Sequence, residues 1–289
     1  MKWYEETMLN EHGKHSTKTE DFDLLLQLSL WGNRCDLSLS GGNEAAAESS
    51  KHGPEEETRH LKPFLLVDHS KQVWQWLSSV TDKPQRIDII LDNAGYELIN
   101  DLLLVDWLLH QQLADGSPAF EPIFLHYKSM PWFVSDTNLH DFEYTLKWLQ
   151  DRPNSKGLAG RIAKMVENGR LKLETHKFWT SPHHFWRISE IAPDLFTELK
   201  KSRILIFKGD LNGRKMFADL KWKPTDKLQT AVGPLAKLFA PSKTALCLAR
   251  TLKCEVAFGI DETKYQEIQS KSPDWSYSGK YGEIQAIIP

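Results

Sequence analysis

Apolar residues recur along this chain with two periods, one typical of helices and one typical of strands. A spacing of three to four residues predicts helices at 21–32, 70–80, 96–114, 139–150 and 192–202. Short runs rich in isoleucine, leucine and phenylalanine predict strands at 86–92, 122–128 and 203–210, with one or two more within 243–260. Strands separated by helices predict an α/β fold, whose largely parallel sheet is covered on both faces.

Two stretches fit this pattern less directly. Residues 64–68, with the sequence FLLVD, fit either a short strand or an apolar turn before the next helix. Residues 41–60 are small, polar and charged, which predicts a flexible linker or insertion.

The composition predicts an intracellular protein of the cytoplasm or nucleus. Hydrophobic residues make up 40% of the 289 positions, charged residues 26%, and the formal net charge is -3. This balance gives no reason to expect a nucleic acid or an anionic membrane as a partner. The first residues lack the apolar core of a signal peptide, and no apolar run is long enough to span a membrane. Three cysteines without paired spacing favour a reducing compartment, and oligomeric state has no sequence signal.

Polar side chains follow three of the predicted strands or apolar runs. The residues concerned are Asp92, Asn93, Asp136, Asp210 and Asn212. Each of them alone fits an ordinary helix cap. Ligands of open α/β sheets bind beyond the carboxyl ends of the strands, so we expect these side chains to share one polar rim.

The residue types at this rim favour a hard metal ion. Carboxylates that lie close together repel each other unless a cation is shared between them. Aspartate and asparagine oxygens suit Mg²⁺ or Mn²⁺. His183 and His184 are neighbours in sequence and point apart, which favours a structural or pocket-wall role.

Cationic residues near the strand ends add a hypothesis of phosphate binding. Lys128, Arg214 and Lys253 lie at or just after predicted strands. A solvated surface is the simpler interpretation of each, but beside a divalent ion they could hold a phosphate group. The glycine-rich motifs of nucleotide triphosphate and dinucleotide sites do not occur.

Several separated motifs resemble one known family. They are LDNAGYELINDLLLVDWLL, PWFVSDT, FKGDLNGRK and the tetrad RTLK at 250–253, with SLWGNRCDLSLS and GKYGEIQ towards the two ends. In this order they resemble the metal-dependent damage-control phosphatase family, in its eukaryotic sugar-phosphate branch with an RTxK motif. That branch has also been named as a protein-glutamate O-methyltransferase.

The resemblance implies a three-layer α/β/α sandwich with a largely parallel central sheet, preceded by a helical domain. Only about 28 residues precede SLWGN, so we expect the N-terminal helical domain to be mostly missing. The expected divisions are a remnant of the helical region at 1–40, a linker or insertion at 41–60 and the phosphatase domain at 61–289.

The resemblance also assigns the site residues. Its metal ligands fall on Asp92, Asn93 and Asp136. Its substrate contacts fall on Asp92, Asn93, Asp210, Leu211, Asn212, Gly213, Arg214 and Lys253. Glu97 and Asp136 match positions assigned to S-adenosylmethionine in the methyltransferase description. For a phosphatase, we expect catalytic roles for Asp92, Asp136 and Asp210.

The expected substrates are sugar phosphates such as fructose 1-phosphate and fructose 6-phosphate, with Mn²⁺, Co²⁺, Ni²⁺ or Mg²⁺ as the activating ion. Gly213 stands where the family usually has tyrosine, and FADL at 217–220 stands where it has TGDR. Two alternatives remain open. One is methyl transfer from S-adenosylmethionine to a protein carboxyl group, and the other is a shortened relative that binds without catalysis.

Overall fold

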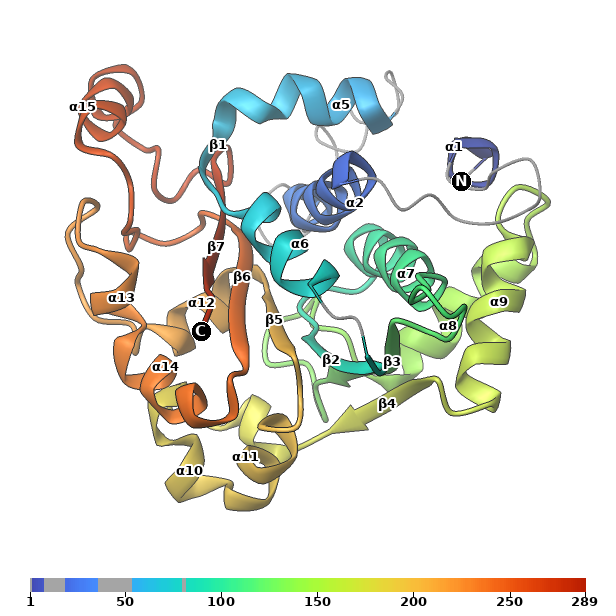
Figure 1. Cartoon of the computed structure of the whole chain (residues 1–289). Helices are drawn as coiled ribbons and strands as arrows, with labels where there is room; N and C mark the ends of the chain where they lie inside the picture. Colours follow the sequence, from blue (N-terminus) through green and yellow to red (C-terminus); the bar gives the residue numbers. More distant parts are fainter. Residues whose placement is uncertain (1, 8–18, 36–53, 80–81) are drawn as a thin grey trace.

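In the described part of the chain, seven strands form one sheet at the centre of the molecule (Figure 1). The structure is a computed structural model and describes residues 2–7, 19–35, 54–79 and 82–289. The strands are β1 (Leu65–Asp68), β2 (Gln85–Ile90), β3 (Phe120–Tyr127), β4 (Leu171–Thr175), β5 (Ile204–Lys208), β6 (Ala245–Thr251) and β7 (Gly282–Ile287). Their order is β1-β7-β6-β5-β2-β3-β4, and every pair is parallel except β6 and β7.

Helices cover both faces of this sheet. The α-helices in the described ranges are α1 (Lys2–Thr7), α2 (Thr19–Trp31), α5 (Pro54–Leu61), α6 (Ser70–Ser78), α7 (Tyr96–Leu109), α8 (Leu139–Gln150), α9 (Lys156–Glu167), α10 (Ile188–Ile191), α11 (Pro193–Leu199), α12 (Gly209–Met216), α13 (Leu228–Ala231), α14 (Gly233–Phe239) and α15 (Glu262–Lys271). Residues of α2, α6, α7, α8 and α9 form one buried cluster with the sheet, and residues of α11, α12 and α14 form another. The fold is therefore the expected three-layer α/β/α sandwich.

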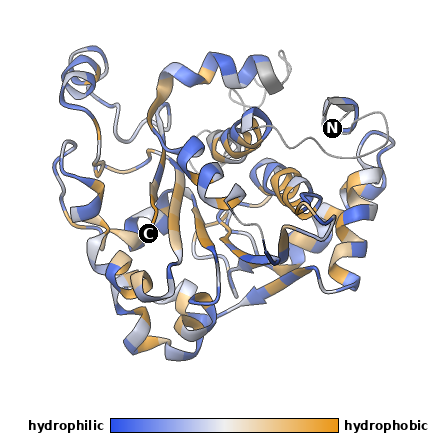
Figure 2. Cartoon of the chain, viewed as in Figure 1, coloured by the Kyte–Doolittle hydropathy of each residue, from blue (hydrophilic) through white to orange (hydrophobic). Residues whose placement is uncertain are grey.

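The central strands are apolar on both sides because each face is covered. In β5, Ile204 and Ile206 belong to one buried cluster, whereas Leu205 and Phe207 belong to the other. This alternation follows the two-residue period of a strand. Figure 2 shows the hydrophobic residues concentrated in the central strands and in α7.

Some elements differ from the sequence expectation or were missing from it. The FLLVD segment contains a strand, β1, which pairs with β7. The region 243–260 contains one named strand, β6. The edge strand β4, with the sequence LKLET, was not predicted because only Leu171 is buried and its other residues are exposed or half-buried.

The helix predicted at 21–32 is confirmed as α2, and it packs into the main core. Leu25, Leu26, Leu30 and Trp31 belong to the same buried cluster as the sheet residues. Within the predicted linker, residues 54–60 belong to α5, and residues 41–53 lie outside the described part of the chain. The division into three segments stays a prediction.

None of the described helices has both the length and the apolar character needed to cross a bilayer.

Candidate active site

Asp92, Asn93 and Asp136 lie together at the carboxyl edge of the sheet. Asp92 follows β2, and Asp136 follows β3, which pairs with β2 in parallel. Asn93 and Asp136 form a backbone bridge, and the backbone N–H of Thr137 donates to the carbonyl of Asp92 at 2.8 Å. The two loops are thus joined directly, so the shared rim expected from the sequence includes these three residues.

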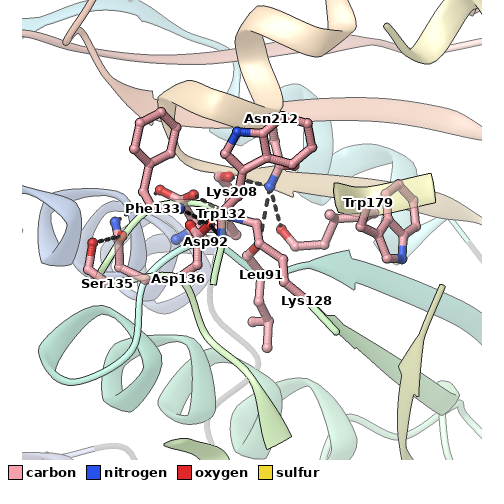
Figure 3. A network of polar contacts seen from close by, with 12 residues as sticks. Leu91, Asp92, Lys128, Trp132, Phe133, Ser135, Asp136, Trp179, Lys208 and Asn212 are labelled. Atoms are coloured by element: carbon pink, nitrogen blue, oxygen red, sulfur yellow. Dashed lines mark hydrogen bonds and ion pairs between the residues drawn. The ribbon is translucent and has the colours of Figure 1, made fainter. Parts of the chain in front are cut away.

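The Lys128 ammonium group lies between the two carboxylates. Its Nζ donates to Asp92 Oδ1 at 3.2 Å and to Asp136 Oδ1, and its side chain is only 2% exposed (Figure 3). The other oxygen of Asp136, Oδ2, accepts backbone N–H groups of Trp132 and Phe133, both at 2.8 Å. Burial raises the pKa of Asp136, and the Lys128 charge offsets part of that rise. Burial alone would lower the pKa of Lys128, but the two carboxylates outweigh it and raise that pKa.

These residues fit a hard metal ion by their chemistry. The Asp92 and Asp136 carboxylates already converge on one cationic group, and both supply oxygen, which Mg²⁺ and Mn²⁺ prefer. Asn93 adds an amide, whose Oδ1 accepts the Ser135 hydroxyl at 2.7 Å. Among the described residues, no group of three or more His, Cys, Asp or Glu side chains could hold a metal. A site in this region would therefore rest on two carboxylates and an amide.

Lys208, Glu97 and Asp101 form a second group of buried charges next to these residues. Lys208 Nζ, at the end of β5, contacts Glu97 Oε1 at 2.8 Å, Asp101 Oδ1 at 2.9 Å and the Ser29 carbonyl at 2.8 Å. Burial raises the pKa of Glu97 to about 7, although the Lys208 charge opposes it. The carboxylates of Glu97 and Asp101 raise the pKa of Lys208 against the effect of its burial.

Glu97 leaves little surface for a ligand. The residue is 1% exposed, and its Oε2 accepts from Asn33 Nδ2 at 2.7 Å and from Asn93 Nδ2 at 2.9 Å. With Lys208 on its other oxygen, the carboxylate is fully engaged within the protein. A cofactor could contact it only by displacing these partners.

Asp210 begins a second group, at the first turn of α12. Its Oδ1 accepts from Arg250 Nη1 at 2.9 Å, and Arg250 also contacts Glu283 Oε2 at 3.3 Å. Gly209, the preceding residue, brings this turn against Asp92, because a Cβ built on Gly209 would lie 1.8 Å from Asp92 Oδ2. Asp92, Asp136 and Asp210 therefore lie on the same edge of the sheet, and Asp210 is held by an arginine.

The remaining residues of the DLNGR segment have different surroundings. Asn212 is 1% exposed and donates to the Lys208 carbonyl at 2.7 Å and the Leu91 carbonyl at 3.1 Å, which ties α12 to two strands. Leu211 is half-buried. Gly213 packs against Arg250, since an added Cβ would lie 2.9 Å from Arg250 Cδ. The arginine therefore occupies space that a larger residue at 213 would need.

Two of the predicted cationic residues contact other groups. Arg214 is 37% exposed and pairs with Asp219 at 2.6 Å, on the surface of α12. Lys253 Nζ donates to the Asn33 carbonyl at 2.8 Å.

His183 and His184 precede the short 3-10 helix Phe185–Arg187 and contact Arg187 and Trp186.

Sequence reasoning missed three residues that lie close to this group. Asn33 bonds directly to Asp92, Lys208 supports Glu97, and Arg250 holds Asp210. The motifs SLWGN and RTLK contain Asn33 and Arg250, so the signal was present but gave neither residue a role. Lys208 ends an apolar strand, where a lysine ordinarily emerges to solvent.

We expect Glu283→Gln to reduce the pH dependence of stability. Burial raises the pKa of Glu283 from 4.5 to about 6, and the Arg250 charge offsets only part of this rise. The folded state then holds this proton more tightly than the unfolded state. This tighter proton binding at Glu283 stabilises the folded state fully below pH 4.5, and the stabilisation is lost as the pH rises through 6.

Urea unfolding at pH 4 and pH 7 measures this effect. Between pH 4 and pH 7, we expect the free energy of unfolding of the unmodified chain to fall by about 2 kcal/mol more than that of Glu283→Gln. Glu143→Gln, on the exposed side of α8, serves as the control and should follow the unmodified chain. Equal pH dependence in the chain and in Glu283→Gln would contradict the assignment.

Comparison with known proteins gives a family match over most of the chain. The family model described as the damage-control phosphatase ARMT1-like domain matches residues 5–268. The damage-control phosphatase ARMT1 of Xenopus tropicalis is 42% identical over 277 residues, which cover 93% of this chain and 59% of that protein. The Mus musculus ARMT1 is 38% identical over 276 residues, which cover 92% and 58%.

The chain therefore spans about three fifths of the length of these curated relatives. A solved structure, that of a DUF89 family protein from Pyrococcus horikoshii, aligns with 16% identity and a TM-score of 0.42. The alignment covers 86% of this chain and 62% of that one.

Proposed function

Because this chain belongs to the damage-control phosphatase ARMT1-like domain family, we propose that it is a metal-dependent phosphatase of small phosphorylated metabolites. Sugar phosphates, with fructose 1-phosphate and fructose 6-phosphate as the first candidates, are the proposed substrates. Mn²⁺, Co²⁺, Ni²⁺ or Mg²⁺ is the proposed ion. The observation that carries the proposal is that the carboxylates of Asp92 and Asp136 both contact the Lys128 ammonium group at the carboxyl edge of the sheet.

In this proposal, Asp92, Asn93 and Asp136 would hold the metal, and the bound ion would supply Lewis acidity towards the phosphoryl group. Backbone N–H groups of Trp132 and Phe133 fix the orientation of Asp136 by binding its second oxygen. The rigid anchoring of both carboxylates limits the reorganisation needed when charge changes during the reaction.

The phosphoryl group needs cations of its own, because negative charge spreads over its oxygens in the transition state. Lys253 is the proposed cation, since its ammonium group lies beside Asn33, which bonds directly to the proposed metal ligand Asp92. Arg214 is a second candidate, and it would have to leave Asp219 to reach a substrate. Arg250 holds the Asp210 carboxylate, which gives Asp210 an organising role in the first turn of α12.

Substitution of the carboxylates tests this assignment. We expect Asp92→Asn and Asp136→Asn to lower Mn²⁺-dependent release of phosphate from fructose 1-phosphate by about a hundredfold or more, because each removes a charged metal ligand. Circular dichroism should show a folded chain in both cases. Asp151→Asn, at the exposed end of α8, is the matched control and should keep full activity.

Retained metal-dependent turnover in both site variants would contradict the assignment. The same preparations can be assayed for transfer of a labelled methyl group from S-adenosylmethionine. The buried and fully bonded Glu97 does not favour that activity. A chain that binds Mn²⁺ and sugar phosphate without turnover would instead support the non-catalytic relative.

A further inference from the structure

Asn33 connects residues from several parts of the candidate active site. It lies in the 3-10 turn Gly32–Cys35 after α2 and is 1% exposed. Its Nδ2 donates to Asp92 Oδ2 at 2.9 Å and to Glu97 Oε2 at 2.7 Å. Its Oδ1 accepts the Thr251 hydroxyl, and its backbone carbonyl accepts Lys253 Nζ at 2.8 Å. One residue thus contacts a proposed metal ligand and two members of the RTLK tetrad.

The amide suits this place by its hydrogen-bonding groups. The NH₂ group of asparagine has two donors, which match the two buried carboxylates, and its carbonyl oxygen matches the hydroxyl donor. An aspartate would add a third negative charge beside Asp92 and Glu97, and an alanine would leave each carboxylate without one of its donors.

Close packing holds Asn33 in a fixed position. A Cβ built on Gly32 would lie 2.7 Å from the Cα of Glu97, so this turn rests directly on the backbone of α7. At the end of α2, the Ser29 carbonyl accepts Lys208 Nζ at 2.8 Å. The segment from Ser29 to Asn33 therefore has little freedom to move relative to the sheet.

We propose that Asn33 is a positioning residue, which fixes the Asp92 carboxylate relative to Thr251 and Lys253 and thereby sets the spacing between the metal and the phosphate-binding lysine. This role rests on the proposed function of the site. It also makes the α2 segment a part of the active site, in addition to its place in the core.

Loss of the amide should act on metal binding more than on folding. Without Asn33, Asp92 Oδ2 keeps a donor in Asn93 Nδ2 at 2.9 Å, but it loses the group that connects it to the tetrad. Residues that orient metal ligands typically change metal affinity by about ten- to a hundredfold when they are removed.

The test measures Mn²⁺ binding to the purified full chain by calorimetry, with and without inorganic phosphate. We expect Asn33→Ala to weaken Mn²⁺ binding by about ten- to a hundredfold. Thr251→Val conserves shape and removes only the hydroxyl, so a smaller loss is expected. In the double variant, the loss of Mn²⁺ affinity should be smaller than the two single losses combined, because both substitutions remove the Asn33–Thr251 hydrogen bond.

Gln111→Ala is the matched control. Gln111 is also a buried amide, just beyond the C-terminal end of α7, and its Nε2 bonds to the Trp107 carbonyl rather than to the site. This variant should change stability without changing Mn²⁺ affinity. A fall in affinity equal to that of Asn33→Ala would assign the effect to general destabilisation and overturn the proposal.

The outcomes separate the two levels of the inference. If the unmodified chain binds Mn²⁺ and Asn33→Ala binds it equally well, the positioning role is wrong and the proposed function stands. If the unmodified chain binds none of Mn²⁺, Co²⁺, Ni²⁺ and Mg²⁺, the proposed function fails and the positioning role fails with it. Should Asn33→Ala not fold, unchanged affinity in Thr251→Val overturns the role.

Discussion

Gly209→Ala is expected to abolish Mn²⁺-dependent phosphate release. A methyl group at this position would lie 1.8 Å from Asp92 Oδ2 and 2.2 Å from its Cγ, so the carboxylate could not keep its place. Gly209 also has a φ of +80°, a left-handed conformation that costs roughly 1–2 kcal/mol for alanine. Strand β5 must turn sharply into α12 here, directly against the proposed metal ligand.

The measurement is phosphate release from fructose 1-phosphate, together with calorimetric titration of Mn²⁺. We expect a loss of at least about a hundredfold in rate, since the metal ligand itself is displaced. Gly160→Ala provides the matched control, because no atom lies within 4 Å of its added Cβ and it is exposed on α9. Normal activity in Gly209→Ala would show that the Asp92 carboxylate is not needed where the structure places it.

Lys208→Met is expected to give a large loss of stability. The ammonium group is fully buried and bonds to the carboxylates of Glu97 and Asp101. Removing one partner of a buried ion pair leaves uncompensated charge and costs about 3–5 kcal/mol. Methionine has nearly the same shape, so the change tests charge more than packing.

Urea unfolding at pH 7 measures this loss. Lys201→Met is the matched control, because Lys201 pairs with Glu198 at 2.5 Å and both side chains are more than half exposed. Exposed pairs contribute at most about 1 kcal/mol, so the control should remain close to the unmodified chain. A loss below about 1 kcal/mol in Lys208→Met would mean that Glu97 and Asp101 do not depend on this lysine.

The sequence was sufficient to predict the layers of the fold. Buried strands such as β5 carry continuous apolar runs, and long helices such as α7 carry a strong apolar period, so both stand out. The edge strand β4 and the short strand β1 do not, because exposure at an edge weakens the pattern. Their places depend on pairing with distant strands.

For the candidate site, the sequence predicted the shared edge but not its internal bonding. Asp92 and Asp136 follow recognisable strands, and the parallel arrangement brings such ends together. The contact between Asn33 and Asp92 joins residues 59 positions apart, across an intervening segment of low complexity. The Lys128 position between two carboxylates likewise depends on how the loop after β3 turns back.

The place of β7 in the sheet has a consequence for synthesis on the ribosome. Among the described strands, β1 has β7 as its single neighbour, so Leu65 cannot pair until Gly282 has been synthesised. β7 also pairs with the other open edge, that of β6, in the antiparallel direction. Contacts between such distant positions slow folding, and strands without partners can pair with other chains. In a nascent chain, β1 and β6 therefore each lack a neighbour until β7 has been synthesised, and we expect them to be open to pairing with other chains until then.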